Sequence, residues 1–160
     1  MHPPPESGSQ SPESGGQTPV VVTQEQLRRE RLRFTNFSFS RTPAGLCTAE
    51  VELEWIEGVR VSGRKTGQSS PMGDLRIAAE AAIQAIEAFT KGELQLELLG
   101  VKALRAFDAN IVIVSLETKK GEGPRRLLGS YLAERDPIRA AVVAVLNATN
   151  RILGNFVATR

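Results

Sequence analysis

The periodicity of the apolar residues changes twice along the chain, each time in the same order. Between residues 33 and 68, apolar side chains alternate with polar ones, most clearly at Val51 and Leu53, which is typical of strands with one buried face. Residues 75–89 then place apolar side chains at helical spacing. Three strands and a helix follow again over residues 93–157. The sequence therefore predicts an α+β fold, a duplicated β-β-β-α unit whose antiparallel sheets and two helices pack in two layers.

The two units align when the chain is shifted by 62 residues. This shift places Gly67 on Gly129 and Asp74 on Asp136, and it superposes several alanines of the two helices. A three-stranded sheet has an apolar face that one amphipathic helix covers incompletely. We therefore expect the two units to share one core.

The start of each helix is marked by a cap and a proline. Ser70 before Pro71, and Asp136 before Pro137, supply an N-cap side chain and a first helical residue. Asp74 falls in the first turn of its helix, where a negative charge suits the helix dipole. These residues are therefore expected to have structural roles at the helix N-termini.

The N-terminal segment differs in composition from the rest of the chain. Residues 1–19 contain five Pro, four Ser and three Gly, and Met1 is their one hydrophobic residue, which predicts a disordered leader. A Thr-x-x-Gln capping box begins at Thr23 and predicts a short surface helix. The predicted boundaries are 1–22 for the leader, 23–32 for the helix, and 33–157 for a single domain of two repeats, 33–92 and 93–157.

The residues available for catalysis are few. The chain has one cysteine, Cys47, and one histidine, His2, which lies in the leader. This separation argues against Ser-His-Asp or Cys-His catalysis and against a Cys/His zinc site. Cys47 is expected to be a reduced core residue of a cytoplasmic protein, since no signal peptide or membrane-spanning run is present. We therefore expect no enzyme, no cofactor, no metal site and no membrane partner.

The basic residues could form a surface that binds nucleic acid. The chain carries 20 Lys+Arg against 18 Asp+Glu, and basic pairs fall at predicted hairpins and strand ends. These residues could bind nucleic acid along one edge: Arg64, Lys65, Lys119, Lys120, Arg125 and Arg126. A nucleic-acid surface usually also needs interleaved aromatics, which are missing, so nucleic-acid binding is the alternative and not the expected function. A protein-interaction scaffold is the other alternative.

The second unit resembles the C-terminal regulatory (dimerisation) domain of 2-isopropylmalate synthase and the related citramalate synthase. The resemblance extends over residues 109–153 and is carried by the strand 111–114, Gly129, Asp136, Ile138, Ala140–Ala141 and the alanine-rich final helix that ends in Asn150-Arg151. Residues 33–90 match this domain in pattern alone. The family's domain is also a duplicated β-β-β-α unit, in agreement with the order found here from periodicity.

The resemblance implies a non-catalytic regulatory module that pairs with a second copy. In the family, a small hydrophobic amino acid is held as an effector at the dimer interface. The catalytic TIM barrel of the family has no counterpart in these 160 residues, so synthase activity is not implied. The turn at Gly67 also departs from the Gly-Pro turn of the family.

Five residues are candidates for binding such an effector: Gly67, Gly129, Asp136, Asn150 and Arg151. The glycines could give a ligand access to the backbone, or they could mark bulges and turns. The helix start at Asp136 could hold a carboxylate, or Asp136 could be a cap. Asn150 and Arg151 could contact a ligand or a partner subunit, or they could stabilise the end of the last helix.

Overall fold

The computed structural model describes residues 32–55, 58–121 and 123–158. The predicted leader and nearly all of the predicted helix over 23–32 lie outside these residues. The elements run in the order β1 (Arg33–Arg41), β2 (Leu46–Glu54), β3 (Arg60–Gln68), α2 (Pro71–Phe89), β4 (Leu96–Ala106), β5 (Ala109–Thr118), β6 (Arg126–Leu132) and α3 (Pro137–Ala158). The strands form two antiparallel sheets, β1-β2-β3 and β4-β5-β6. The predicted α+β fold with a duplicated β-β-β-α unit is confirmed.

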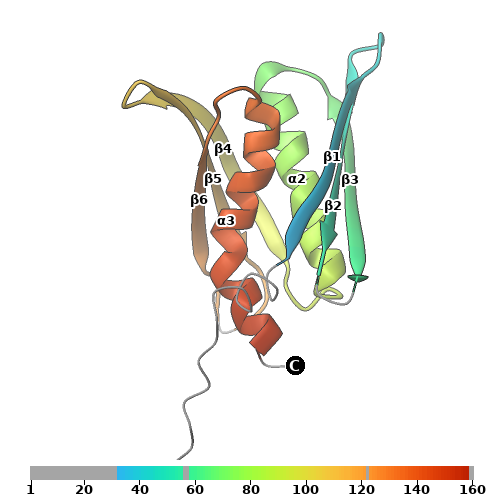
Figure 1. Cartoon of the computed structure of the whole chain (residues 1–160), viewed down its shortest axis with the longest axis vertical. Helices are drawn as coiled ribbons and strands as arrows, with labels where there is room; N and C mark the ends of the chain where they lie inside the picture. The colour runs from blue at the N-terminus through green and yellow to red at the C-terminus, as the bar shows by residue number, and fades with distance from the viewer. Residues whose placement is uncertain (1–31, 56–57, 122, 159–160) are drawn as a thin grey trace, which may run out of the picture.

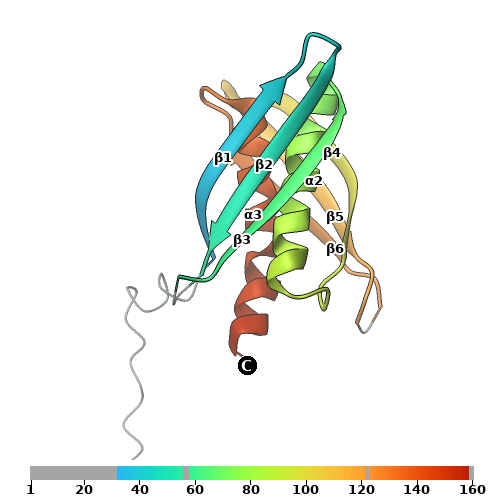
Figure 2. The ribbon, with the colours of Figure 1, turned by 90° about the vertical axis from the view of Figure 1, so that its right-hand side faces the viewer.

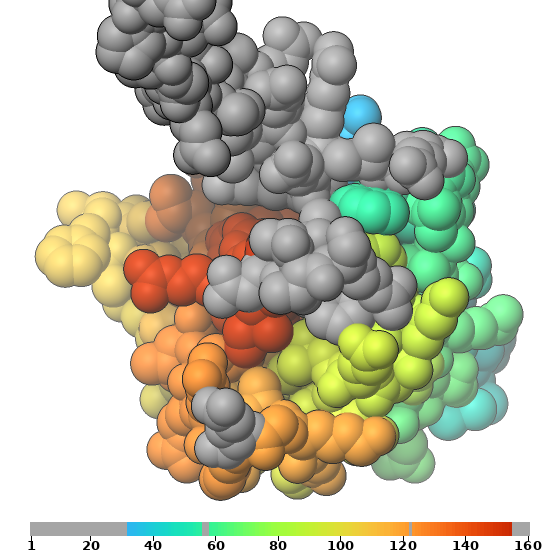
Figure 3. All heavy atoms as spheres, turned by 90° about the horizontal axis from the view of Figure 1, so that it is seen from below, coloured from blue at the N-terminus to red at the C-terminus, as the bar shows by residue number. Residues whose placement is uncertain are grey.

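The two units pack with their helices against each other. In each unit one sheet and one helix form two layers, and α2 and α3 lie side by side between the two sheets (Figures 1 and 2). Seen from below, the ends of α2 and α3 lie between the green first sheet and the orange second sheet (Figure 3). The helices are therefore covered on both sides, which explains why their buried faces are rich in small side chains.

The core is formed by the inner faces of the sheets and by the alanines of the helices. The alternation that predicts the middle strands is exact in the structure: Cys47, Ala49, Val51 and Leu53 of β2, and Val112, Val114 and Leu116 of β5, are fully buried. Each large aliphatic side chain contributes roughly 1.5–3 kcal/mol to folding. Trp55 is half-buried and packs edge-to-face on Phe89, with ring centroids 5.8 Å apart.

Two glycines let the helices approach the sheets at equivalent places. Gly63 of β3 lies beneath the carbonyl oxygen of Ala81, and Gly129 of β6 lies beneath that of Ala144, so closely that a Cβ at either glycine would overlap the helix backbone. Gly63 pairs with Val51 and Gly129 pairs with Val114. The contacts of Gly63 and Gly129 are therefore the same in the two units.

This equivalence corrects the alignment of Gly67 with Gly129. The middle strands and helices correspond at a shift of 63 residues, but the third strands correspond at 66. The β5–β6 hairpin is three residues longer than the β2–β3 hairpin, and α3 has three residues fewer than α2 between its first residue and the carbonyl that covers the glycine. A single shift cannot follow two length changes that cancel, so Gly63 is the counterpart of Gly129.

Candidate functional site

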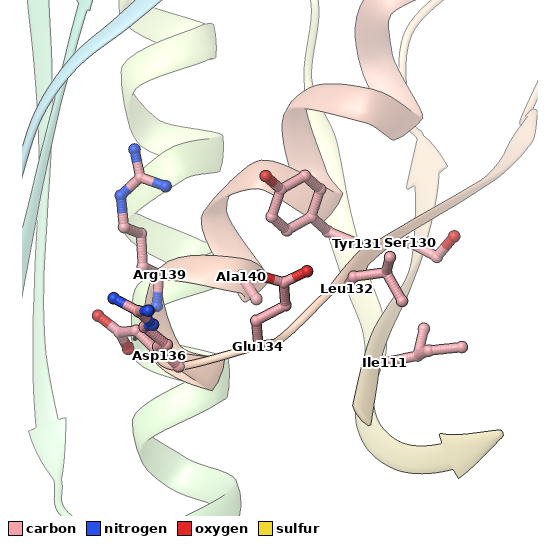
Figure 4. Close-up of a pocket in the computed structure, with 9 residues that line it drawn as sticks. Ile111, Ser130, Tyr131, Leu132, Glu134, Asp136, Arg139 and Ala140 are labelled. Carbon is pink, nitrogen blue, oxygen red and sulfur yellow. Dashed lines mark hydrogen bonds between the residues drawn. The ribbon is translucent and has the colours of Figure 1, made fainter. Parts of the chain in front are cut away.

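A cavity of about 580 Å³ lies between the ends of β5 and β6 and the first turns of α3 (Figure 4). Its walls come from three segments, because β6 ends at Leu132 and the chain must turn back to begin α3. The N–H of Ala133 donates to the carbonyl of Asn110 at 2.7 Å, which fixes this turn against β5. The cavity is therefore formed by the geometry of the strand-to-helix connection.

One wall of the cavity is apolar. Ile111 of β5 is paired with Leu132 of β6, and both side chains line the cavity together with the ring of Tyr131 and the methyl group of Ala140 (Figure 4). Leu132 is 50% exposed and Tyr131 is 43% exposed. This much exposed apolar surface beside a cavity is typical of a site that is covered by a ligand or a partner.

The rim of the cavity carries both signs of charge. Asp136 is occupied as the N-cap, since its Oδ1 accepts the N–H groups of Ile138 and Arg139, each at 3.1 Å. The guanidinium of Arg139 stacks over the ring of Phe34, 4.8 Å from its centroid. Glu134 and Arg135 make no ion pair or side-chain hydrogen bond within the part of the chain that the structure describes. One acid and one base at the rim are therefore available to a charged ligand.

A second cavity, of about 560 Å³, lies between the first turns of α2 and α3 and has Asp74 in its lining. Asp74 is buried and already saturated with donors. Its Oδ2 accepts from Arg41 at 2.6 Å, its Oδ1 accepts from the hydroxyl of Ser69 at 2.8 Å, and the thiol of Cys47 also donates to it. We therefore assign this cluster a structural role, locking β1 and β2 to the start of α2.

The pKa values in this cluster agree with its geometry. Burial alone would raise the pKa of Asp74, but the hydrogen bonds from Arg41, Ser69 and Cys47 outweigh it and lower the pKa below its ordinary value. Burial, and then the hydrogen bond to the Asp74 carboxylate, raise the pKa of the Cys47 thiol. Cys47 is therefore a protonated core residue, unsuited to nucleophilic chemistry.

The structure places the five predicted effector residues apart. Asp136 lines the cavity beside α3. Gly129 is covered by α3, and Gly67 lies against the side chain of Ile77. Asn150 and Arg151 are exposed on α3, about 21 Å along the helix from Asp136 at 1.5 Å per residue. One of the five predicted residues therefore belongs to the candidate site.

Eight of the nine lining residues were missed by the sequence argument, among them Ile111, Tyr131, Leu132, Glu134 and Arg135. A signal for them was present. Residues 111–114 are apolar without alternation. A strand with one solvent-exposed face usually alternates apolar and polar residues, whereas a strand that is covered on both faces is continuously apolar. The surplus apolar side chains point to the outer face of the second sheet, and the cavity opens at their edge.

The basic residues do not form one edge. Arg64 and Lys65 lie on β3 of the first sheet, whereas the other basic pairs lie at the β5–β6 hairpin of the second sheet, with both helices between them. Two of these lysines are in ion pairs: Lys65 with Glu80 at 3.7 Å and Lys119 with Glu97 at 3.4 Å. The expectation that these residues lie along a single edge is wrong, because β3 and β6 belong to different sheets.

Among the described residues, no group of three His, Cys, Asp or Glu side chains is placed to hold a metal ion. No helix within the described ranges is long and apolar enough to cross a membrane. In comparisons with known proteins, no family model and no curated protein matches the sequence.

Proposed function

We propose that the chain is a non-catalytic regulatory and dimerisation module that binds a small hydrophobic amino acid in the cavity beside α3. The observation that carries this proposal is the combination of an apolar wall with one acid and one base on the rim, Glu134 and Arg135, that have no partner among the described residues. An amino acid zwitterion has the same three features. The module would act in the cytoplasm, where Cys47 stays reduced, and as a homodimer.

The recognition chemistry follows from the lining residues. The Arg135 guanidinium would bind the carboxylate of the amino acid, because a planar pair of donors suits a carboxylate. The Glu134 carboxylate would accept from the ammonium group. Ile111, Tyr131 and Leu132 would contact the aliphatic side chain (Figure 4). A cavity of about 580 Å³ lies within the range usual for small-ligand sites.

Thermal unfolding in the presence of each of the twenty amino acids tests the proposal. A ligand that binds the folded state alone, at a hundredfold excess over its Kd, stabilises a protein by about 2.7 kcal/mol, so we expect a rise of several degrees in Tm with leucine, isoleucine or valine. The amide and the decarboxylated amine of the same amino acid should give little or no rise, because they lack the group that Arg135 would bind.

Two variants make this test specific. Arg135→Gln should reduce the affinity for the amino acid at least tenfold while leaving Tm without ligand nearly unchanged, since Arg135 has no partner among the described residues. Arg126→Gln is the matched control, because Arg126 is exposed at the opposite end of β6 and should bind as the wild type does. No rise in Tm with any amino acid would refute the effector proposal.

A further inference from the structure

The outer faces of the two sheets differ in chemistry although the sheets are equivalent in fold. Along the middle of β2, the outer face of the first sheet carries polar pairs with β3, including Thr48 with Thr66 and Glu50 with Arg64. The second sheet presents apolar side chains on the same outer side: Leu104, Ile111 and Leu132 in one row, Ile113 in the next row, and Leu128 beyond it. Leu128 is 69% exposed. Duplication of the fold does not explain this difference, whereas a partner on the second face does.

The β4–β5 hairpin extends this apolar face with an aromatic residue. Phe107 is 100% exposed at the tip of the hairpin, which bends away from the helices at the upper left of Figure 1. Ala106 pairs with Ala109, so the loop has two residues, and both have positive φ angles, 52° at Phe107 and 59° at Asp108. Such a turn favours Asn-Gly, and a bulky side chain at its first position is unfavourable. A strained, fully exposed aromatic residue indicates a functional contact.

We propose that the outer face of the second sheet is the surface on which a second copy of the chain packs, with Phe107 as its anchor. This inference rests on the proposed function in one respect, that the module works as a pair. It adds the face and the anchoring residue, and it places Ile111 and Leu132 in both the interface and the effector cavity.

The spacing of the apolar residues fits a two-fold axis. Phe107 lies four residues before Ile111, and Leu128 pairs with Ser115, which lies four residues after Ile111. Each separation is about 13 Å along the strand. A two-fold axis that runs across the strands, along the row of Leu104, Ile111 and Leu132, therefore brings Phe107 of each copy to Leu128 of the other. A contact of this kind is made twice and closes the assembly as a dimer.

The charges on this face fit the same axis. Lys102 pairs with Ile113, two residues beyond the row of Ile111, and Asp108 lies three residues before that row. The axis therefore brings Asp108 of one copy close to Lys102 of the other, with opposite charges. Within the described residues neither side chain has an ion pair. This complementarity favours a second copy over an unrelated partner, since one chain supplies both members of each contact.

Sedimentation equilibrium of the full chain, without added amino acid, tests the proposal. We expect the wild type to dimerise at micromolar concentration and Phe107→Asn to raise the dissociation constant at least tenfold. Asparagine suits the turn better than phenylalanine. At protein concentrations below the dissociation constant of the dimer, this variant should therefore be at least as resistant to urea as the wild type. Loss of pairing then cannot be ascribed to a damaged fold.

A matched pair of variants locates the face. Leu128→Asp should abolish pairing, whereas Leu46→Asp should not, because Leu46 is a 41% exposed leucine at the end of the first sheet. A monomeric wild type, or a Phe107→Asn variant that pairs like the wild type, would overturn the proposal. Amino-acid binding is measured separately on the same variants, so failure of the effector proposal leaves this result intact, and the reverse also holds.

Discussion

Replacing Gly129 with alanine is expected to lower the free energy of unfolding by about 3 kcal/mol, at the upper end of what overpacking usually costs. The new methyl group would overlap the carbonyl oxygen of Ala144 and the backbone nitrogen of Ala148. These are backbone atoms of a helix that is held on both sides, so the clash can be relieved by moving α3 as a whole and not by rotating a side chain. Gly63→Ala should lower the free energy of unfolding by a similar amount, because its methyl group would overlap the backbone of Ala81 and Ala85.

Urea denaturation followed by circular dichroism measures this effect. Gly154→Ala is the matched control, since an added Cβ at Gly154 in α3 would meet no heavy atom within 4 Å beyond its chain neighbours and its own helix backbone, and alanine should stabilise the helix there by about 0.5–1 kcal/mol. Gly100→Ala, also in open space, should have little effect. If Gly129→Ala and Gly154→Ala gave the same stability, the close approach of α3 to β6 would be wrong.

Replacing Asp74 with asparagine is expected to cost about 3 kcal/mol at pH 7, because hydrogen bonds to a charged group contribute about 1.5–3 kcal/mol and Arg41 would lose its counter-ion. Asp136→Asn is the matched control. Asp136 acts as an N-cap, and asparagine caps a helix as well as aspartate does, so its effect should be close to zero. Equal effects of the two substitutions would contradict the different roles assigned here to two residues that the sequence alignment superposes.

The contribution of Asp74 should depend on pH in a defined direction. Its pKa in the folded state is lowered, so the stability that it contributes is present above the unfolded pKa of about 3.9 and is lost as the pH falls through the folded value. The stability difference between wild type and Asp74→Asn should therefore be constant above about pH 5 and shrink below about pH 4. A difference that grows on acidification would show that the carboxylate is not stabilised by its donors.

The fold could be predicted because its signals are local and repeated. Alternation at Val51 and Leu53, and the cap and proline at Ser70–Pro71, depend on neighbours in sequence, and the structure confirms the N-cap at Ser70, whose hydroxyl accepts from the Gly73 N–H at 2.8 Å. The register of the repeat was less accessible, because compensating length changes in a hairpin and at the start of a helix hide the equivalence of Gly63 and Gly129.

The site was harder to predict because it depends on how β5, β6 and α3 pack within the second unit. Asp136 was found through its capping pattern, but Asn150 and Arg151 are a long way from it on the same helix. The cavity arises where β6 turns into α3, and its wall of Ile111 and Leu132 is brought together by strand pairing. The outer position of such apolar residues is visible in sequence only when both faces of each strand are considered.

The proposed effector cavity and the proposed pairing face share Ile111 and Leu132. If both proposals hold, binding of an amino acid and pairing of two copies must be linked, and each must change the other by the same factor. The amino acid would then change the dissociation constant of the dimer, and Phe107→Asn would change the affinity for the amino acid. This linkage would give the module a regulatory output without any catalytic residue.

The most direct test of the central claim is a titration of the isotope-labelled full chain with leucine, followed by amide chemical shifts in NMR spectra. We predict saturable shifts concentrated at Ile111, at residues 131–136 and in the first turn of α3, and their loss in Arg135→Gln. No saturable shift with leucine, isoleucine or valine, or shifts centred on Asn150 and Arg151 at the other end of α3, would contradict the account.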